Sequence, residues 1–269
     1  MKPGKLAFIG MGLHDETDLT IKAQQILQQC NHVFAELYTS QVMGTTIEKL
    51  EECIGKSIQV LSREQTEDGT ILLEAAQHGT VGFLVGGDPM IATTHVDLRI
   101  RAHQKGIPTS IIHNSSIMTA VPGLLGLQNY KFGRTTTLAY PEKDYFPMSP
   151  YEVIQQNYEI GLHTLVLLDI QADKQRFMTA NEGLKFLLQM EEHYKKKIIT
   201  GDAVACVVAR AGSEEPVIRA DTIDTLLEED FGPPLHTLVL PGSLHFMEYD
   251  ALVSLAGLPE EIAHERQKL

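Results

Sequence analysis

The chain has 269 residues, of which 43% are hydrophobic and 21% charged, so it can build one large or two modest cores and does not have the composition of a disordered chain. Its formal net charge of −13 argues against direct binding of DNA or RNA, because nucleic-acid-binding domains are usually basic. No apolar run approaches the roughly 20 residues of a membrane helix. The three cysteines have neither zinc-site nor disulfide-framework spacing. Because a predicted strand follows the polar start directly, we expect no secretory leader. We therefore expect a cytoplasmic protein with no membrane, nucleic-acid or metal site.

In the first 113 residues, short apolar runs alternate with segments of helical periodicity. The apolar runs predict strands at 5–9, 32–37, 58–61, 81–85 and 110–113. The intervening patterns predict helices at 18–29, 46–53 and 91–105, and the end of a helix at 70–78. Strict alternation of strand and helix predicts right-handed crossovers and a mostly parallel sheet.

The remaining residues contain the same ingredients in a looser order. Strands are predicted at 136–140, 164–169, 203–209, 217–219 and 236–240. Helices are predicted at 116–126, 150–160, 180–194, 222–229 and 244–256. The strands at 203–209 and 217–219 are close enough to form a hairpin, which predicts a mixed sheet. The chain is thus predicted to form two α/β domains, residues 1–113 and 114–269.

Two predicted strands of the first domain end in glycines, at Gly10-Met11-Gly12 and at Gly86-Gly87-Asp88-Pro89. Open parallel sheets bind small molecules outside the carboxyl ends of their strands, and glycine there lets a ligand approach the backbone. A dinucleotide fingerprint needs a third glycine where this chain has Asp15, so nicotinamide or flavin binding is not expected. Arg210-Ala211-Gly212-Ser213 is a third strand end of this kind, in the second domain.

The sequence allows two roles each for Asp88 and His95. Because Pro89 pushes the preceding residue into an extended conformation, Asp88 would either cap the next helix or contact a ligand, and the two roles are compatible. As a ligand contact, its carboxylate could hold a cationic amine or a ribose hydroxyl. His95, in the helix expected after that loop, would either be buried and hydrogen-bonded or face the acceptor.

Several strings of residues together resemble one family. Gly87-Asp88-Pro89 is shared by the tetrapyrrole methylase fold family, whereas Ala35-Glu36-Leu37-Tyr38-Thr39-Ser40 and Ala92-Thr93-Thr94-His95 are particular to its diphthine synthases. The resemblance covers almost the whole chain. It implies two α/β domains with S-adenosylmethionine, the methyl donor, bound in the cleft between them. By matching motifs, it places the donor site on Leu13, Asp88, Ile91, Ser116, Ile117, Leu168, Ala211 and His236.

Two segments depart from the pattern. Val85-Gly86-Gly87 stands where a Thr-Pro-Gly type sequence is expected, which should leave the Asp88 contact intact. Leu13-His14-Asp15 replaces the Gly-Pro-Gly-Asp style step of the tetrapyrrole methylases, and this argues against a tetrapyrrole acceptor.

The resemblance also implies an acceptor and a reaction. The acceptor is a histidine of translation elongation factor 2 that carries a 3-amino-3-carboxypropyl group, whose amine is methylated. The amine must be neutral to attack, so a base or water must take its proton. Candidate helpers are His95, Tyr38 and Glu142. A homodimer is implied as well.

Two other functions stay open at this point. A small-molecule methyltransferase of the tetrapyrrole type would need a wide apolar trough, and only 6% of the residues are aromatic. A non-catalytic sensor of an adenosine ligand would bind donor and product without turnover.

Overall fold

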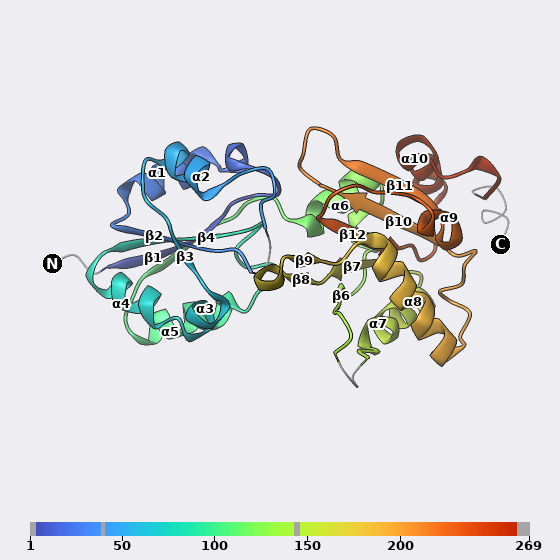
Figure 1. The fold of residues 1–269 in the computed structure, drawn as a ribbon, viewed down its shortest axis with the longest axis horizontal. Coiled ribbons are helices and arrows are strands. Elements are labelled where there is room, and N and C mark those ends of the chain that lie inside the picture. Colours follow the sequence, from blue (N-terminus) through green and yellow to red (C-terminus); the bar gives the residue numbers. More distant parts are fainter. Residues whose placement is uncertain (1–3, 39–40, 143–145, 263–269) are drawn as a thin grey trace. The chain divides into compact units, whose positions relative to one another are not determined.

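The computed structural model describes residues 4–38, 41–142 and 146–262 (Figure 1). The chain divides into two compact units, the first made of Met1–Ile117 with Ala172–Lys174 and the second of Met118–Gln171 with Gln175–Leu269. The domain boundary expected at 113/114 thus lies four residues before the division between the units. Within the described ranges, no helix is long and apolar enough to span a bilayer.

The first unit contains a five-stranded sheet in the order β3-β2-β4-β1-β5, and all its neighbouring strands are parallel. The strands are β1 (Lys5–Gly10), β2 (His32–Glu36), β3 (Gln59–Leu61), β4 (Thr80–Val85) and β5 (Thr109–Ile112). The alternation of strands and helices in the sequence had predicted this parallel sheet. All strands therefore end at one edge, where their loops meet.

Helices cover both faces of this sheet (Figure 1). They are α1 (Ile21–Gln29), α2 (Ile47–Ile54), α3 (Arg63–Asp68), α4 (Thr70–His78) and α5 (His95–Gln104). Alternate residues of β1 point to opposite faces. Ile9 belongs to the same apolar cluster as Leu27 of α1, whereas Phe8 belongs to the cluster of Leu72 on α4. Because both faces are buried, the strands read as continuous apolar runs.

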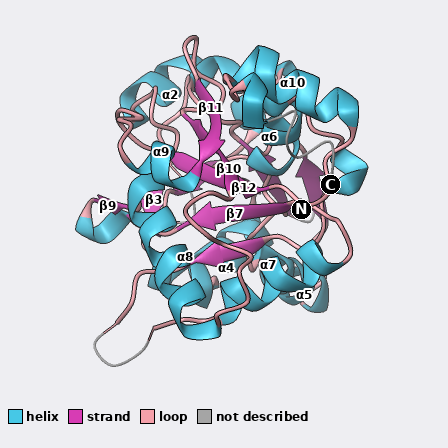
Figure 2. Cartoon of the chain, turned by 90° about the vertical axis from the view of Figure 1, so that its right-hand side faces the viewer, coloured by secondary structure: helices cyan, strands magenta, loops and turns pink. Residues whose placement is uncertain are grey.

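The second unit contains a mixed five-stranded sheet in the order β11-β10-β12-β7-β6 (Figure 2). Its strands are β6 (Thr136–Leu138), β7 (Thr164–Leu168), β10 (Val204–Ala209), β11 (Val217–Thr222) and β12 (His236–Leu240). Strands β6 and β7 pair in parallel, the other neighbouring strands of this sheet are antiparallel, and β10 and β11 form the predicted hairpin. A small hairpin of β8 (Ile170–Gln171) and β9 (Arg176–Phe177) follows β7.

The helices that accompany this second sheet are α6 (Ile117–Leu125), α7 (Ser149–Glu159), α8 (Ala180–Tyr194), α9 (Ile223–Leu227) and α10 (Phe246–Ala256). The buried face of α8 carries Leu184, Leu187 and Met190, a helical spacing that places them all against the sheet. A capping box between Thr179 and Glu182 fixes the start of this helix.

Three elements differ from the sequence predictions. The helix expected over 91–105 begins only at His95, because the backbone turns after Pro89 and Ala92 has a φ of 55°. Helix α3 was not predicted, since it has no apolar periodicity and depends on a capping box at Ser62. The β8–β9 hairpin was also missed, because two-residue strands carry no readable alternation.

Candidate functional site

The ends of β4 and β1 are joined by the two glycine loops of the first unit. The Met11 amide donates to the Val85 carbonyl at 2.8 Å. Gly12 and Gly87 then exchange two backbone hydrogen bonds, of 2.7 and 3.3 Å. Their φ values of 84° and 67° lie in the left-handed region that favours glycine. The two glycine-marked strand ends that the sequence predicts therefore lie side by side at one edge of the sheet.

Asp88 is the polar centre of this edge and is only 6% exposed. Its Oδ1 accepts a hydrogen bond from the Met90 amide at 3.0 Å, and its Oδ2 accepts from His113 Nδ1 at 2.7 Å and from the Asn114 amide at 3.3 Å. The helix-capping reading of Asp88 is wrong, because the next helix, α5, starts at His95. A carboxylate offers about four acceptor positions, so these three bonds leave one on Oδ1 for a ligand.

The two glycines that flank this edge differ in the space around them. A Cβ added to Gly10 would lie 2.4 Å from the Gly87 carbonyl oxygen, so Gly10 is needed for packing. A Cβ on Gly87 would meet nothing nearer than the Ser115 carbonyl oxygen at 3.8 Å. The backbone of Gly87 is therefore open to the close approach of a ligand, and the Ser116 Cα lies beside it at 4.0 Å from that position.

Five of the residues expected to bind the donor belong to these strand-end loops. Leu13 follows the Gly12 bridge, the Ile91 amide donates to the Asp88 carbonyl at 3.3 Å, and Ser116 is 5% exposed. Ile117 begins α6 directly after Ser116. The structure thus brings Leu13, Asp88, Ile91, Ser116 and Ile117 to one edge of the first sheet.

Two polar side chains that the sequence analysis missed hold the loops in place. Asp18 Oδ2 accepts hydrogen bonds from the amides of Leu13 and His14, at 2.9 and 2.7 Å. Asn114 Nδ2 donates to the carbonyls of Gly10 and Asp18, at 3.0 and 2.9 Å. The Asp18 contacts are local, four and five residues along the chain, whereas the Asn114 contacts span 104 and 96 residues, a distance over which no local pattern could have pointed to them.

His95 and Tyr38, two of the three candidate catalytic residues, lie on either side of the fully buried Glu36. His95 is 2% exposed; its Nδ1 donates to the Pro89 carbonyl at 3.1 Å, and its Nε2 is 3.8 Å from Glu36 Oε1. The Tyr38 amide donates to Glu36 Oε2 at 3.1 Å. Burial, together with the Glu36 carboxylate, raises the pKa of Tyr38 to about 12. The structure favours the buried, hydrogen-bonded reading of His95.

Glu142, the third candidate, belongs to the second unit and is exposed. It follows the edge strand β6 of the second sheet.

The remaining three expected donor contacts gather at one edge of the second sheet. Strand pairing sets Ala209 opposite His236, and His236 immediately precedes Thr237, which pairs with Leu167. Leu168 is therefore next to His236, and Ala211 follows the end of β10 two residues after Ala209. Leu168, Ala211 and His236 are all nearly buried, at 7%, 9% and 6% exposed.

The ring of His236 is already engaged by the protein. Its Nδ1 accepts from the Ala180 amide at 3.1 Å, while its Nε2 donates to the carbonyls of Gly232 and Pro233, both at 3.1 Å. Burial lowers the pKa of this imidazole against the opposing effect of those carbonyls. A ligand at this edge would therefore contact the backbone of His236 or the carbon atoms of its ring.

Each of the two edges, taken by itself, offers groups that could contact a ligand. Asp88 retains an acceptor position for a hydroxyl or an amine, and Gly87 leaves its backbone accessible. Two residues after Ala211, the buried Ser213 Oγ has no hydrogen-bond partner among the described residues. The described ranges contain no group of three or more His, Cys, Asp or Glu side chains arranged to hold a metal ion.

Comparison with known proteins finds relatives along nearly the whole chain. Residues 5–227 match the family of Tetrapyrrole (Corrin/Porphyrin) Methylases. A diphthine synthase of Methanothermobacter thermautotrophicus is 50% identical over 257 residues, which cover 96% of this chain and 97% of the relative. That of Methanocaldococcus jannaschii is 52% identical and covers 92% and 97%. A crystal structure of a diphthine synthase matches with a TM-score of 0.88 at 37% identity, over 96% of this chain and 98% of that one.

The family match spans most of the chain. The relatives align along nearly their whole length and are identical to this chain at about half of the aligned positions. The chain therefore belongs to the tetrapyrrole methylase family and, within it, to the diphthine synthases.

Proposed function

We propose that the protein is an S-adenosylmethionine-dependent N-methyltransferase. Its acceptor is the amino group of the 3-amino-3-carboxypropyl-histidine of translation elongation factor 2, and its product is diphthine in diphthamide biosynthesis. The observation that carries the proposal is the edge around Asp88, with one acceptor position left on a buried carboxylate, in a chain half identical to diphthine synthases.

The donor supplies an electrophilic methyl group on a sulfonium, and the chain supplies residues to hold it. In the first unit, Asp88 Oδ1 would accept a hydrogen bond from a ribose hydroxyl or an amine, and Gly87 would allow close approach to its backbone. In the second unit, Leu168, Ala211 and the backbone of His236 would contribute apolar and main-chain contacts, with Ser213 Oγ ready to form a hydrogen bond.

The protein's contribution to the reaction is mainly positioning. Holding the amine behind the methyl group converts a bimolecular displacement into an effectively unimolecular one. The amine must lose a proton first, but His95 is buried with Nδ1 on a carbonyl, and the raised pKa of Tyr38 disfavours its basic form. We therefore propose that solvent water takes the proton.

A mass spectrum tests the proposal. Elongation factor 2 carrying the 3-amino-3-carboxypropyl-histidine is incubated with the protein and S-adenosylmethionine. We expect mass gains in whole methyl increments that disappear with Asp88→Ala and persist with Glu260→Ala, a control at an exposed carboxylate. No gain, while S-adenosylhomocysteine still binds in calorimetry, would overturn the acceptor and leave the small-molecule and sensor functions.

The implied homodimer is part of the same proposal. Helix α10 exposes Phe246, Met247 and Leu255 at 60%, 59% and 55%, which is unusual for large apolar side chains and would suit a subunit interface. Sedimentation equilibrium should give twice the chain mass, and Phe246→Lys with Leu255→Lys should give the monomer. A wild-type monomer over the whole concentration range would contradict the dimer.

A further inference from the structure

Arg176, on the small hairpin that follows β7, has no assigned role, yet it is held in a defined position. Its Cζ lies 3.4 Å from the centre of the Tyr140 ring, so the guanidinium stacks on the aromatic face. Tyr140 itself is 4% exposed, whereas Arg176 is exposed to solvent. A long side chain that would otherwise sample many rotamers is thus supported on a buried ring.

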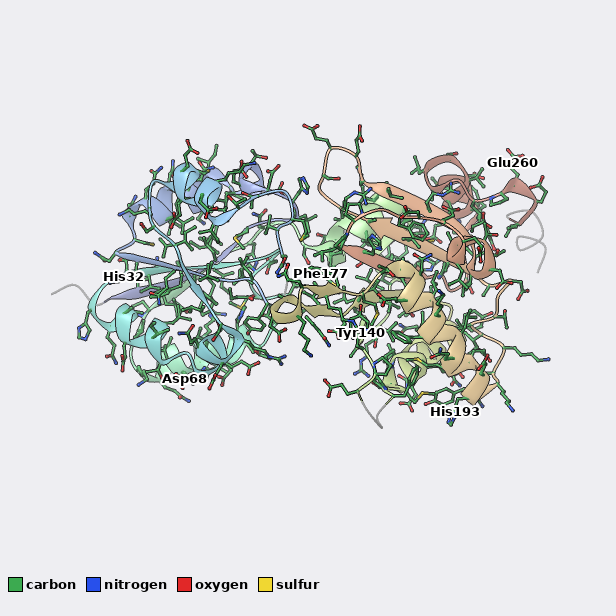
Figure 3. All side chains as sticks on the ribbon, in the orientation of Figure 1. His32, Asp68, Tyr140, Phe177, His193 and Glu260 are labelled. Atoms are coloured by element: carbon green, nitrogen blue, oxygen red, sulfur yellow. The ribbon has the colours of Figure 1, made fainter. Side chains whose placement is uncertain are left out.

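The ring beneath Arg176 is itself anchored. The Tyr140 hydroxyl donates to Glu182 Oε2 at 2.9 Å, and the Tyr140 amide donates to Asp169 Oδ2 at 3.0 Å. Glu182 also caps α8 through the Thr179 amide, at 3.0 Å. Figure 3 labels Tyr140, which emerges from the segment just after β6.

The guanidinium contacts Tyr140, yet it forms no ion pair in the described part of the chain. Among the described residues, no carboxylate oxygen lies within 4.0 Å of an Arg176 nitrogen, although Asp169 and Glu182 both contact Tyr140, on which Arg176 stacks. Those two carboxylates accept hydrogen bonds from Tyr140 instead. An arginine fork matches a planar carboxylate through two parallel hydrogen bonds.

This arginine lies at the same edge of the second sheet as the expected donor contacts. Asp169, which holds the Tyr140 backbone, follows Leu168 directly. Four residues after Arg176, the Ala180 amide donates to His236 Nδ1. The edge that carries Leu168 and His236 therefore also carries a guanidinium that is held on Tyr140 and has no carboxylate partner among the described residues.

We propose that Arg176 is a carboxylate-recognition residue, and that its ligand is the carboxylate of a 3-amino-3-carboxypropyl group. This inference rests on the proposed function, which brings two such groups to the protein. One is the amino-acid end of S-adenosylmethionine, and the other is the modification on the acceptor histidine. Both present the same α-amino acid carboxylate, and the experiment separates them.

The test uses Arg176→Gln, with Arg176→Lys to keep the charge without the fork. Arg134→Gln is the matched control, because Arg134 is another exposed arginine of the same unit. It lies before β6, at the opposite end of this strand from Tyr140. Calorimetry measures the Kd of S-adenosylhomocysteine and of 5′-methylthioadenosine, which lacks the aminocarboxypropyl group. Steady-state methylation measures KM for modified elongation factor 2 separately from kcat.

If Arg176 reads the donor, Arg176→Gln raises the Kd of S-adenosylhomocysteine by about 10- to 100-fold and leaves that of 5′-methylthioadenosine unchanged. If it reads the acceptor, both Kd values hold and KM for the protein acceptor rises by a similar factor. In either case, Arg176→Lys gives a smaller loss. Unchanged Kd and KM values, or equal losses for both nucleosides, overturn the inference.

Failure of the proposed function gives a different pattern. Wild-type protein would then leave modified elongation factor 2 unmethylated, while the calorimetric comparison of the two nucleosides would still test Arg176 at the donor. Conversely, methylation by the wild type with Arg176→Gln indistinguishable from Arg134→Gln would sustain the function and refute the role of Arg176.

Discussion

His113 Nδ1 lies 2.7 Å from Asp88 Oδ2 and so connects the ends of β4 and β5, the two strands on either side of β1. The His113 side chain is 70% exposed and that of Asp88 only 7%. The carboxylate therefore belongs to the protein's interior, and the imidazole covers it from the solvent side. This arrangement directs one oxygen of Asp88 to the strand end at His113 and leaves the other oxygen to the Met90 loop.

Asp88→Asn should weaken donor binding more than it weakens the fold. An amide group can replace only one of the two acceptor oxygens, so either the Met90 amide or the His113–Asn114 pair faces a donor in place of an acceptor. We expect a loss of about 1–3 kcal/mol of unfolding free energy. The Kd of S-adenosylhomocysteine should rise by at least about 10-fold, measured by calorimetry.

His113→Ala is the companion variant for this prediction. It removes an exposed partner of Asp88 but leaves both backbone amides in place, so its effect on unfolding should stay below about 1 kcal/mol. If Asp88→Asn and His113→Ala lowered the unfolding free energy equally, the amides of Met90 and Asn114 would contribute nothing to the stability of the buried carboxylate.

Gly87→Ala and Gly10→Ala should separate ligand binding from folding. At Gly87 a methyl group meets no atom within 3.8 Å, and a φ of 67° adds strain of about 1 kcal/mol, so the protein should fold. The methyl group would occupy the open face of the loop and block the donor. At Gly10 the methyl group would collide with the Gly87 carbonyl at 2.4 Å, and the first unit should lose its stability.

Thermal unfolding and S-adenosylhomocysteine binding, measured on both glycine variants, check this contrast. Normal nucleoside affinity in a folded Gly87→Ala protein would show that the donor does not approach this loop.

Much of this fold can be predicted from the sequence, because buried parallel strands consist of consecutive apolar residues. The segment that contains β4 and Gly87-Asp88-Pro89 predicts both a strand and the place where it ends. The hydrogen bond from Asn114 to the Gly10 carbonyl, which holds the neighbouring glycine loop, could not be predicted, since it spans 104 residues. The sequence offered burial of His95 as one of two alternatives but could not decide between them, because the outcome depends on Glu36 and Pro89 meeting around the ring in three dimensions.

The pH dependence of turnover should follow the acceptor amine and no side chain of this protein. Tyr38→Phe keeps the aromatic ring and the backbone amide that bonds Glu36, so kcat should change by less than about twofold. Glu142→Gln, at an exposed position, should likewise leave kcat nearly unchanged. Rate profiles measured between about pH 6 and pH 10 should superpose on the wild type. A variant that removes the alkaline rise would identify a dedicated base.

His95→Gln calls for a stability measurement beside its kinetics. The ring packs edge-on against Phe83 with centroids 5.2 Å apart, and its Nδ1 bonds Pro89, so truncation should cost about 1–3 kcal/mol of unfolding free energy. A fall in kcat that tracks the folded fraction supports a structural role. A changed pH profile in fully folded protein would point to proton transfer.

Glu248 should give the second unit an acid-sensitive component of stability. Its side chain is 1% exposed and accepts hydrogen bonds from Lys131 Nζ at 2.5 Å and from His163 Nε2 at 3.0 Å. Burial alone would raise its pKa, but the hydrogen bonds from the backbone amide of His245, Lys131, the Gln128 amide and His163 outweigh burial and lower it to about 2.

Because the folded-state pKa lies below the ordinary value of 4.5, this carboxylate stabilises the fold above about pH 4.5. That contribution is lost as the pH falls through this value towards 2. Glu248→Gln leaves the Lys131 ammonium without its counter-charge and should lower the unfolding free energy by about 3 kcal/mol near neutral pH. The difference from wild type should shrink steadily as the medium is acidified below about pH 4.5.

Urea unfolding across that pH range measures the effect, with Glu260→Gln as the exposed control that should match the wild type throughout. The comparison between variants matters because many other carboxylates also take up protons in acid, and their contribution cancels in the difference. A Glu248→Gln deficit that stays constant down to about pH 3 would mean that the carboxylate's charge contributes nothing, and that the variant merely disrupts packing around His163.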